Sequence, residues 1–262
     1  MKLWLRCILV VFALQVSGLL WAASGSAPPM DKRSGLEFVS PETRLLQEDD
    51  TGNPGMLWVL DGERLWNEPA GTAGLACADC HGEAATSMRG VAARYPLFDA
   101  ASRRPLDLQG RINQCRSARQ GAPALAFESP QLLALGAFVA HQSRGMPVAA
   151  AGDERLAPFI GRGAALYRQR IGQIDLSCAD CHDGQWGERL SGSVIPQAHP
   201  TGYPIYRLEW QSLGTLQRRI RNCMIGVRAE PFAFGAEELV DLELFLMQRA
   251  AGLPLETPGV RP

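Results

Sequence analysis

The pentapeptide Cys-Ala-Asp-Cys-His occurs twice in this chain of 262 residues, at Cys77–His81 and at Cys178–His182. Cys-x-x-Cys-His is the attachment motif of c-type haem, in which two thiols bond the porphyrin and the histidine lies beneath the iron. A zinc site or a thioredoxin-like redox pair would explain neither the fixed histidine nor the duplication. The sequence therefore predicts two covalently bound haem c groups. Their attachment residues are Cys77, Cys80, Cys178 and Cys181, and their proximal ligands are His81 and His182.

The N-terminal residues carry the pattern of a secretory signal peptide. Lys2 and Arg6 precede an apolar run from Cys7 to Leu20, and small residues follow it. We expect a signal peptide over residues 1–25, and no membrane insertion once it is removed. An uncleaved membrane anchor is the alternative, but the apolar run is short and is interrupted by polar residues. Outside the cytoplasm each of the later cysteines needs a bonding partner, and the two haem motifs account for four of them.

The rest of the chain repeats together with the haem motifs. LQGRINQC at residues 108–115 and LQRRIRNC at residues 216–223 are nearly the same, and each is followed by an amphipathic stretch that ends at Gly-x-Pro. Apolar residues in these two stretches share a helical spacing, which predicts a helix face packed on a core. They are Leu132, Leu135, Phe138 and Val139 in the first copy, and Leu239, Leu242, Phe245 and Leu246 in the second.

Composition and the repeat together predict the fold class. The chain has 27 glycines and 18 prolines, and strand-like alternation is scarce. We expect a mainly α fold of two tandem cytochrome c-like domains, related by internal duplication and wrapped by long Gly/Pro-rich loops. The N-terminal domain, at residues 26–150, would hold haem 1; the C-terminal domain, at 151–262, would hold haem 2 and the active site, with Ser143–Pro158 as the linker. The net charge of -1 gives no indication of nucleic-acid binding.

The second axial ligand of each haem can be sought among residues that recur. Methionine is the usual choice, but Met146, the best-placed one in the first copy, has Leu253 as its repeat partner. Cysteine does recur, as Cys115 and Cys223 at the ends of the two octapeptides. We therefore predict His81 and Cys115 as the axial ligands of haem 1, and His182 and Cys223 as those of haem 2. A disulfide between Cys115 and Cys223 is the alternative, since it would suit an oxidising compartment equally well.

Arginines gather around Cys223. Arg218, Arg219, Arg221 and Arg228 lie within a segment, 216–228, that contains no acidic residue. If this segment is helical, Arg219 lies one turn before Cys223 on the same face, where a guanidinium lowers a thiol's pKa and can hold a small dianion. Pairing with haem propionates is the alternative role, and we expect it for one or two of these arginines. A thiolate ligand also lowers the reduction potential, which favours chemistry at sulfur over ordinary electron carriage.

These motifs resemble a known family. The paired CADCH motifs, LQRRIRNC with its arginine four residues before the cysteine, and the following VRAEPFAFGAEELVDLELFL are similar to the SoxA family, the haem-bearing subunits of the SoxAX enzyme of bacterial thiosulfate oxidation. The resemblance covers nearly the whole mature chain and is most specific from Leu216 to Leu246. Some members lack the first haem site, whereas this chain keeps it and so resembles the dihaem type.

The resemblance implies a specific activity. A SoxA subunit pairs in the periplasm with a monohaem cytochrome c, SoxX, and the enzyme acts as an L-cysteine S-thiosulfotransferase. It couples thiosulfate oxidatively to a cysteine thiol of the carrier protein SoxYZ and passes two electrons through haem to a soluble cytochrome c. The resemblance also implies that Cys223 is catalytic and carries a persulfide, that Arg219 binds substrate, and that the haem matched to Cys115 is remote from the reaction.

Two other classes of protein fit parts of the sequence. A dihaem electron-transfer cytochrome with no chemistry of its own would ordinarily use methionine or histidine as distal ligands, and it would not need the arginine cluster. A haem-based gas sensor would use a labile thiolate. The duplicated cysteines and the lack of an attached signalling module argue against the sensor.

Overall fold

The computed structural model describes residues 31–262, so the expected signal peptide lies outside the described residues. The α-helices are α1 (Pro41–Glu48), α2 (Met56–Asn67), α3 (Cys77–His81), α4 (Ala84–Ser87), α5 (Leu108–Cys115), α6 (Pro130–His141), α7 (Ala157–Arg168), α8 (Cys178–His182), α9 (Leu216–Gly226) and α10 (Glu237–Arg249). The strands are β1 (Leu97–Asp99), β2 (Arg104–Leu106), β3 (Arg189–Leu190), β4 (Ser193–Val194), β5 (Ile205–Arg207), β6 (Ser212–Gly214) and β7 (Gly259–Arg261). Among these helices, none combines the length and the apolar character needed to cross a membrane.

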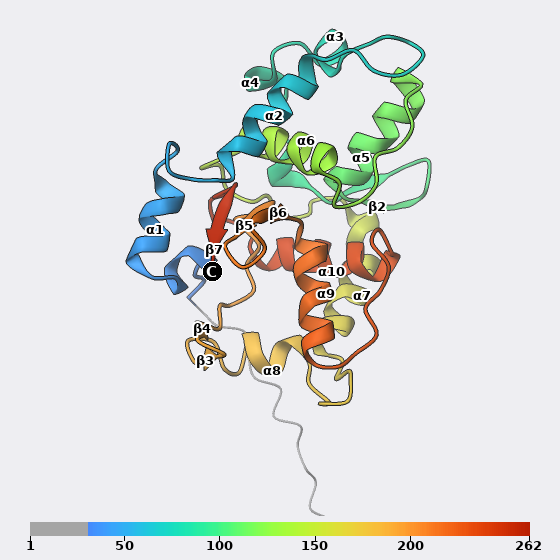
Figure 1. Cartoon of the computed structure of the whole chain (residues 1–262). Coiled ribbons are helices and arrows are strands. Elements are labelled where there is room, and N and C mark those ends of the chain that lie inside the picture. Colours follow the sequence, from blue (N-terminus) through green and yellow to red (C-terminus); the bar gives the residue numbers. More distant parts are fainter. Residues whose placement is uncertain (1–30) are drawn as a thin grey trace, which may run out of the picture.

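Each copy of the repeat is built on one crossed pair of helices. Helix α2 packs on α6 in the first copy, and α7 packs on α10 in the second (Figure 1). Both crossings depend on a glycine, because a methyl group at Gly62 would lie 2.1 Å from Ala134 O, and one at Gly163 would lie 2.1 Å from Asp241 O. The backbones therefore approach equally closely in the two copies, and the mainly α fold with an internal duplication is confirmed.

The predicted core stripe is buried in both copies. Leu132 and Leu239 are completely buried, and the other six residues of the stripe are at most 8% exposed. The α2 residue Trp66 packs on Phe138 with ring centroids 5.8 Å apart, and Tyr167, at the corresponding place in α7, packs on Phe245 at 5.3 Å. Burial of large apolar side chains of this kind, at about 1.5 to 3 kcal/mol each, is what holds the helix pairs together.

A short hairpin precedes each cysteine-bearing helix. Strands β1 and β2 pair antiparallel before α5, and β5 and β6 pair antiparallel before α9. The side chain of Asp107 caps α5 by accepting from Gly110 N at 2.7 Å, and Thr215 Oγ1 caps α9 by accepting from Arg218 N at 3.1 Å. Since the cap fixes where each helix begins, it also fixes where Cys115 and Cys223 stand on it.

The two copies meet through a buried polar contact. Gln217 Nε2, on α9, donates to Asp107 Oδ2 at 2.8 Å, across to the other copy. Glu243, on α10, lies beside this pair, and Asp107 and Glu243 line a small cavity of about 80 Å³. Burial, together with the nearby Asp107 carboxyl, raises the pKa of Glu243 to about 8.

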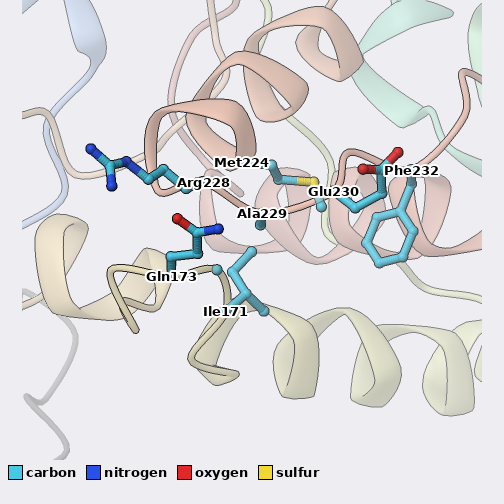
Figure 2. Close-up of a pocket in the computed structure, with 8 residues that line it drawn as sticks. Ile171, Gln173, Met224, Arg228, Ala229, Glu230 and Phe232 are labelled. Carbon is cyan, nitrogen blue, oxygen red and sulfur yellow. The ribbon is translucent and has the colours of Figure 1, made fainter.

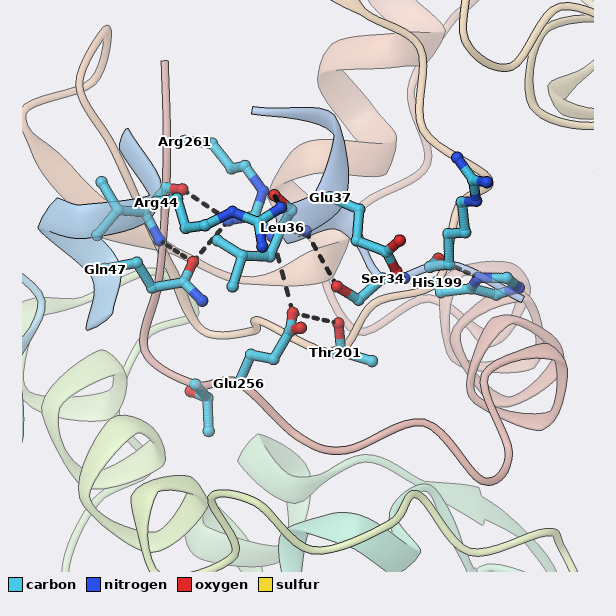
Figure 3. Close-up of polar contacts among 12 residues, drawn as sticks. Ser34, Leu36, Glu37, Arg44, Gln47, His199, Thr201, Glu256 and Arg261 are labelled. Carbon is cyan, nitrogen blue, oxygen red and sulfur yellow. Dashed lines mark hydrogen bonds and ion pairs between the residues drawn. The ribbon is translucent and has the colours of Figure 1, made fainter. Parts of the chain in front are cut away.

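Both ends of the described chain pack on the second copy. Strand β7 joins β5 in parallel, which gives the three-stranded order β6-β5-β7, and α1 lies beside β7 (Figure 1). Gln47 Oε1, from α1, accepts from Val260 N at 2.9 Å and from Arg261 Nη1 at 2.6 Å. Figure 3 shows how Thr201 and Glu256 continue this network, with Thr201 Oγ1 donating to Glu256 Oε2 at 2.8 Å.

The stretch expected as a linker is fastened to the rest of the protein. Within Ser143–Pro158, Val148 is 2% exposed and its N donates to Leu253 O at 2.8 Å. Pro147 and Pro254, which end the two Gly-x-Pro segments, form an antiparallel bridge. The segment therefore joins the copies by packing against the second one rather than by crossing open solvent.

Candidate functional site

The second haem motif occupies a single turn of helix. Ser177 Oγ accepts from Asp180 N at 3.1 Å, and Asp180 Oδ2 accepts from Ser177 N at 2.9 Å, which closes a capping box at the start of α8. Arg170 Nη1 holds the same Asp180 carboxylate at 2.9 Å. Cys178, Cys181 and His182 consequently follow one another on one rigid turn, in the order that attachment of a porphyrin requires.

The His182 ring is oriented by a hydrogen bond to the backbone. Its Nδ1 donates to Pro196 O at 2.6 Å, since a carbonyl oxygen can only accept. This hydrogen bond fixes the orientation of the ring and leaves Nε2 as the nitrogen that would bind iron.

Cys223 faces this histidine from α9. Burial alone would raise the pKa of the Cys223 thiol, but the adjacent His182 imidazole and the Arg219 guanidinium outweigh it and bring the pKa below its usual value. Part of the Cys223 side chain is nevertheless accessible to solvent, so it stands at a boundary rather than within the core. By contrast, burial raises the pKa of the Cys178 thiol to about 12. Only Cys223, of the three cysteines in the second copy, has a pKa shifted toward the thiolate.

The arginines around Cys223 differ in their partners. Arg218 stacks on the Trp210 ring at 4.2 Å and lies 3.8 Å from Glu128 Oε2, and Arg221 stacks on the Phe234 ring at 4.4 Å. Arg219 has no hydrogen bond or ion pair from its guanidinium within residues 31–262. Because α9 is helical, Arg219 lies one turn before Cys223, and the thiolate form of that cysteine raises the arginine's pKa against the effect of burial. The free guanidinium therefore lies one helical turn from the reactive thiol, on the same face of α9.

A second arginine, which the sequence did not single out, joins this group. Arg207, the last residue of β5, is 9% exposed and lies close enough to contribute to the lowered pKa of Cys223. Burial lowers the pKa of Arg207 itself, and the neighbouring Arg219 lowers it further. An alignment of the two hairpins, Tyr95–Asp99 with Tyr203–Arg207, would have marked this position, because the first copy has an aspartate there.

An apolar pocket of about 440 Å³ lies beside the second motif, between the turn that follows α7 and the C-terminal end of α9 (Figure 2). Ile171, Met224 and Phe232 supply its apolar surface, and they belong to the same cluster against which Cys178 packs. Two thiols, an imidazole oriented by Pro196 O, a facing thiol and nearby apolar side chains form the donor set and surroundings that fit a covalently bound haem c. The second copy therefore suits the predicted group.

The first copy repeats the haem motif, but other residues hydrogen-bond it and pack against it. Asp79 Oδ2 accepts from Ala76 N at 2.8 Å, and the His81 ring lies 5.6 Å from the Trp66 ring. Burial raises the pKa of the Cys77 thiol, and the nearby Cys115 adds to this effect, so Cys115 lies close to Cys77 of the first motif. All six cysteines within residues 31–262 are free, and the alternative of a disulfide between Cys115 and Cys223 is not what the structure has.

Comparisons with known proteins agree with this architecture. A family model described as "SoxA/TsdA, cytochrome c domain" matches residues 61–148 and 162–255. The L-cysteine S-thiosulfotransferase subunit SoxA of Pseudaminobacter salicylatoxidans is 36% identical, over 98% of each chain. The subunit of the same name from Rhodovulum sulfidophilum is 38% identical, over 87% of this chain and 80% of that one. The crystal structure of SoxXA from P. pantotrophus superimposes with a TM-score of 0.85 at 33% identity, covering 88% of this chain and 87% of that one.

Proposed function

The chain belongs to the SoxA/TsdA cytochrome c domain family, and from that premise we propose that it is the SoxA-type subunit of an L-cysteine S-thiosulfotransferase. The observation that carries the proposal is the arrangement at Cys223, where a thiol with a lowered pKa faces His182 beside the unpaired Arg219. An electron carrier has no need of a free cation at this place, whereas a reaction of a sulfur oxoanion does.

The membership implies covalently bound haem c, and we infer one haem in each copy. Cys77, Cys80 and His81 would hold haem 1 with Cys115 as second ligand, and the domain at residues 26–150 would contain it. Cys178, Cys181 and His182 would hold haem 2 with Cys223, in the domain at residues 151–262. When bound, haem supplies acceptors of one electron each.

The proposed reaction joins a sulfur of thiosulfate to a cysteine thiol of a SoxYZ-type carrier. One S–S bond forms, the thiol proton is released, and two electrons leave the sulfurs for a soluble cytochrome c. In this reaction Arg219 would hold the oxygens of thiosulfate by charge-assisted hydrogen bonds, and Cys223, as a thiolate or as a persulfide, would stand next to the sulfur that reacts. His182, fixed by Pro196 O, would keep its Nε2 directed at the iron.

The proposal also assigns a partner and a compartment. The likeness to a SoxXA crystal structure supports a small SoxX-type cytochrome c as the second subunit. Covalent haem attachment and the expected signal peptide together favour the periplasm.

Two experiments test this function. Electron paramagnetic resonance of the oxidised holoprotein is expected to show low-spin ferric signals with the narrow g spread of thiolate ligation, and Cys115→Met and Cys223→Met are expected to remove them one at a time. Signals of His/Met or His/His haems that neither variant alters would remove both cysteines from the ligand set.

The second experiment measures turnover of thiosulfate with the carrier protein. Arg219→Ala is expected to leave the haem content intact and to lower kcat/KM by about 10- to 100-fold, the effect of losing a charge-assisted hydrogen bond to the reacting anion. Arg221→Ala is the matched control, because it removes a cation that stacks on Phe234 in the same helix. Equal losses in the two variants would take Arg219 out of the mechanism.

A further inference from the structure

The two copies can be compared residue by residue around their cysteine-bearing helices. Strands β1 and β5 each follow a Tyr-Pro pair, each pair antiparallel with the strand that leads into the cysteine helix, and each end at a charged residue. Asp99 ends β1 and Arg207 ends β5. On the helices, Arg111 and Arg219 both lie four residues before the cysteine. The helix position therefore carries a positive charge in both copies, whereas the strand position is negative in the first copy and positive in the second.

In the first copy this arginine is neutralised. Arg111 Nη2 lies 3.1 Å from Asp99 Oδ1, and the Asp99 side chain is 7% exposed. Ser102 donates to Asp99 Oδ2 from both its N and its Oγ at 2.8 Å, and these hydrogen bonds keep the pKa of Asp99 below its usual value. The carboxylate is thus held charged beside Arg111, and no net positive charge remains near Cys115 from this pair.

In the second copy the same position adds a charge. The guanidinium of Arg219 has no partner within the part of the chain that the structure describes, and Arg207 replaces the carboxylate that would have neutralised it. Among residues 31–262, the ion-pair partner of Arg207 is Glu209, whose Oε1 lies 2.8 Å from Arg207 Nε and whose side chain is 51% exposed. The two guanidiniums carry two positive charges and Glu209 balances one of them, so this pair of positions keeps one positive charge that the Asp99–Arg111 pair does not have. A mostly buried cation of this kind is stabilised by a nearby anion.

We propose that Arg207 and Arg219 together form an oxoanion site beside Cys223, and that Asp99 closes the first copy to the same anion. This inference rests on the proposed function and names a further residue that selects the substrate. The ligand is a small oxoanion with two or more terminal oxygens, such as the sulfonate end of thiosulfate. Each of the two planar guanidinium groups can donate a pair of hydrogen bonds to such oxygens. The charge reversal between Asp99 and Arg207 thus decides which of the two copies can react with it.

A carboxylate of a haem propionate has the same chemistry and is the other source of such an anion. We favour the free oxoanion because Arg219 lies one helical turn before Cys223 on α9, and because Arg207 occupies the position from which Asp99 holds the matching arginine in the first copy. The experiment separates the two sources by measuring substrate binding and haem potential on the same variants.

The first arm uses the holoprotein complex with Arg207→Gln, Arg207→Lys and, as matched control, Arg221→Gln. Arg207→Gln is expected to raise KM for thiosulfate by about 10-fold or more, from the loss of one charge-assisted contact, and Arg207→Lys to recover part of that loss. The control is expected to leave KM within about twofold. If Arg207→Gln does not accumulate with its haem, Arg207→Lys still tests the paired hydrogen bonds of the guanidinium, because lysine keeps the positive charge but not the planar group.

An unchanged KM in Arg207→Gln, with a shifted midpoint potential of haem 2, would overturn the proposal and assign the arginine to a propionate. Wild-type protein that does not turn over thiosulfate would contradict the proposed function instead. In that case the shift of the haem 2 resonance signal on addition of sulfate, lost in Arg207→Gln, still tests the anion site.

The second arm uses Asp99→Asn, which keeps the size of the side chain but frees the Arg111 charge. Sulfate is expected to perturb the haem 2 signal alone in the wild type, and the signals of both haems in this variant. A haem 1 signal that stays insensitive to sulfate in Asp99→Asn would refute the role given to Asp99.

Discussion

Replacing Glu243 with glutamine should change how the stability of the protein depends on pH. The carboxyl is buried beside Asp107 and has its pKa raised from 4.5 to about 8. Between these values the folded state keeps a proton that the unfolded state has released, so the free energy of unfolding falls as pH rises through this window. The contribution is fully present below pH 4.5 and lost above about 8.

The size of the effect follows from the shift. Each pKa unit corresponds to about 1.4 kcal/mol, so the full displacement would remove up to about 5 kcal/mol across the window. Since Glu243 is only partly buried as a whole residue and its surroundings can relax around the ionised carboxylate, we expect about 2 to 3 kcal/mol in practice. Glu243→Gln cannot ionise, and its stability should therefore be flatter with pH than that of the wild type.

Guanidinium denaturation of the holoprotein at pH 5, 6.5 and 8, followed by circular dichroism, measures this difference. The wild type and Glu243→Gln should diverge at pH 8 in favour of the variant. Glu238→Gln, an exposed carboxyl on the same helix, should follow the wild type. Parallel profiles for the wild type and Glu243→Gln would show that the carboxyl does not remain protonated in the fold.

Three further predictions concern packing and ion pairs. Gly163→Ala should lower the free energy of unfolding by about 1 to 3 kcal/mol, because the new methyl group would push α7 away from α10. Gly161→Ala, where a methyl group meets no neighbour, should not lower it. A lower melting temperature for Gly161→Ala than for Gly163→Ala would contradict this. Asp183→Asn should lower the free energy of unfolding by about 3 to 5 kcal/mol, because it breaks the buried ion pair with Arg249. The exposed Asp175→Asn should lower it by less than about 1 kcal/mol. Equal shifts in the denaturation midpoint of the two variants would disprove this difference. Gln47→Ala should cost about 1 to 3 kcal/mol by leaving Val260 N without its acceptor, and the exposed Leu45→Ala should have little effect on the same midpoint.

Much of the architecture could be predicted because the chain carries it twice. The apolar spacing from Leu132 to Val139, repeated from Leu239 to Leu246, indicated helices α6 and α10 and their buried faces, and the caps Asp107 and Thr215 lie where the octapeptides begin. Local signals of this kind depend on neighbours three or four residues away, which a single sequence displays.

The remainder depends on contacts between distant residues. Strands β5 and β7 are three residues long and pair in parallel, so neither alternation nor a turn announces them. Arg207 is likewise invisible as a functional residue when only the neighbourhood of Cys223 is read. Its role follows from the hairpin that folds it back onto α9, and from the comparison with Asp99, a pairing that three-dimensional structure makes plain.

The meeting of the two chain ends has a consequence for the order of folding. Gln47 and Val260 are separated by nearly the whole described chain, and their hydrogen bond, like the pairing of β7 with β5, cannot form before the last residues are available. Closing so large a loop is entropically expensive and therefore slow. The helix pairs α2–α6 and α7–α10 can each assemble earlier from shorter segments. A chain cut just before residue 256 would therefore retain both helix pairs but lose strand β7, through which α1 contacts the second copy.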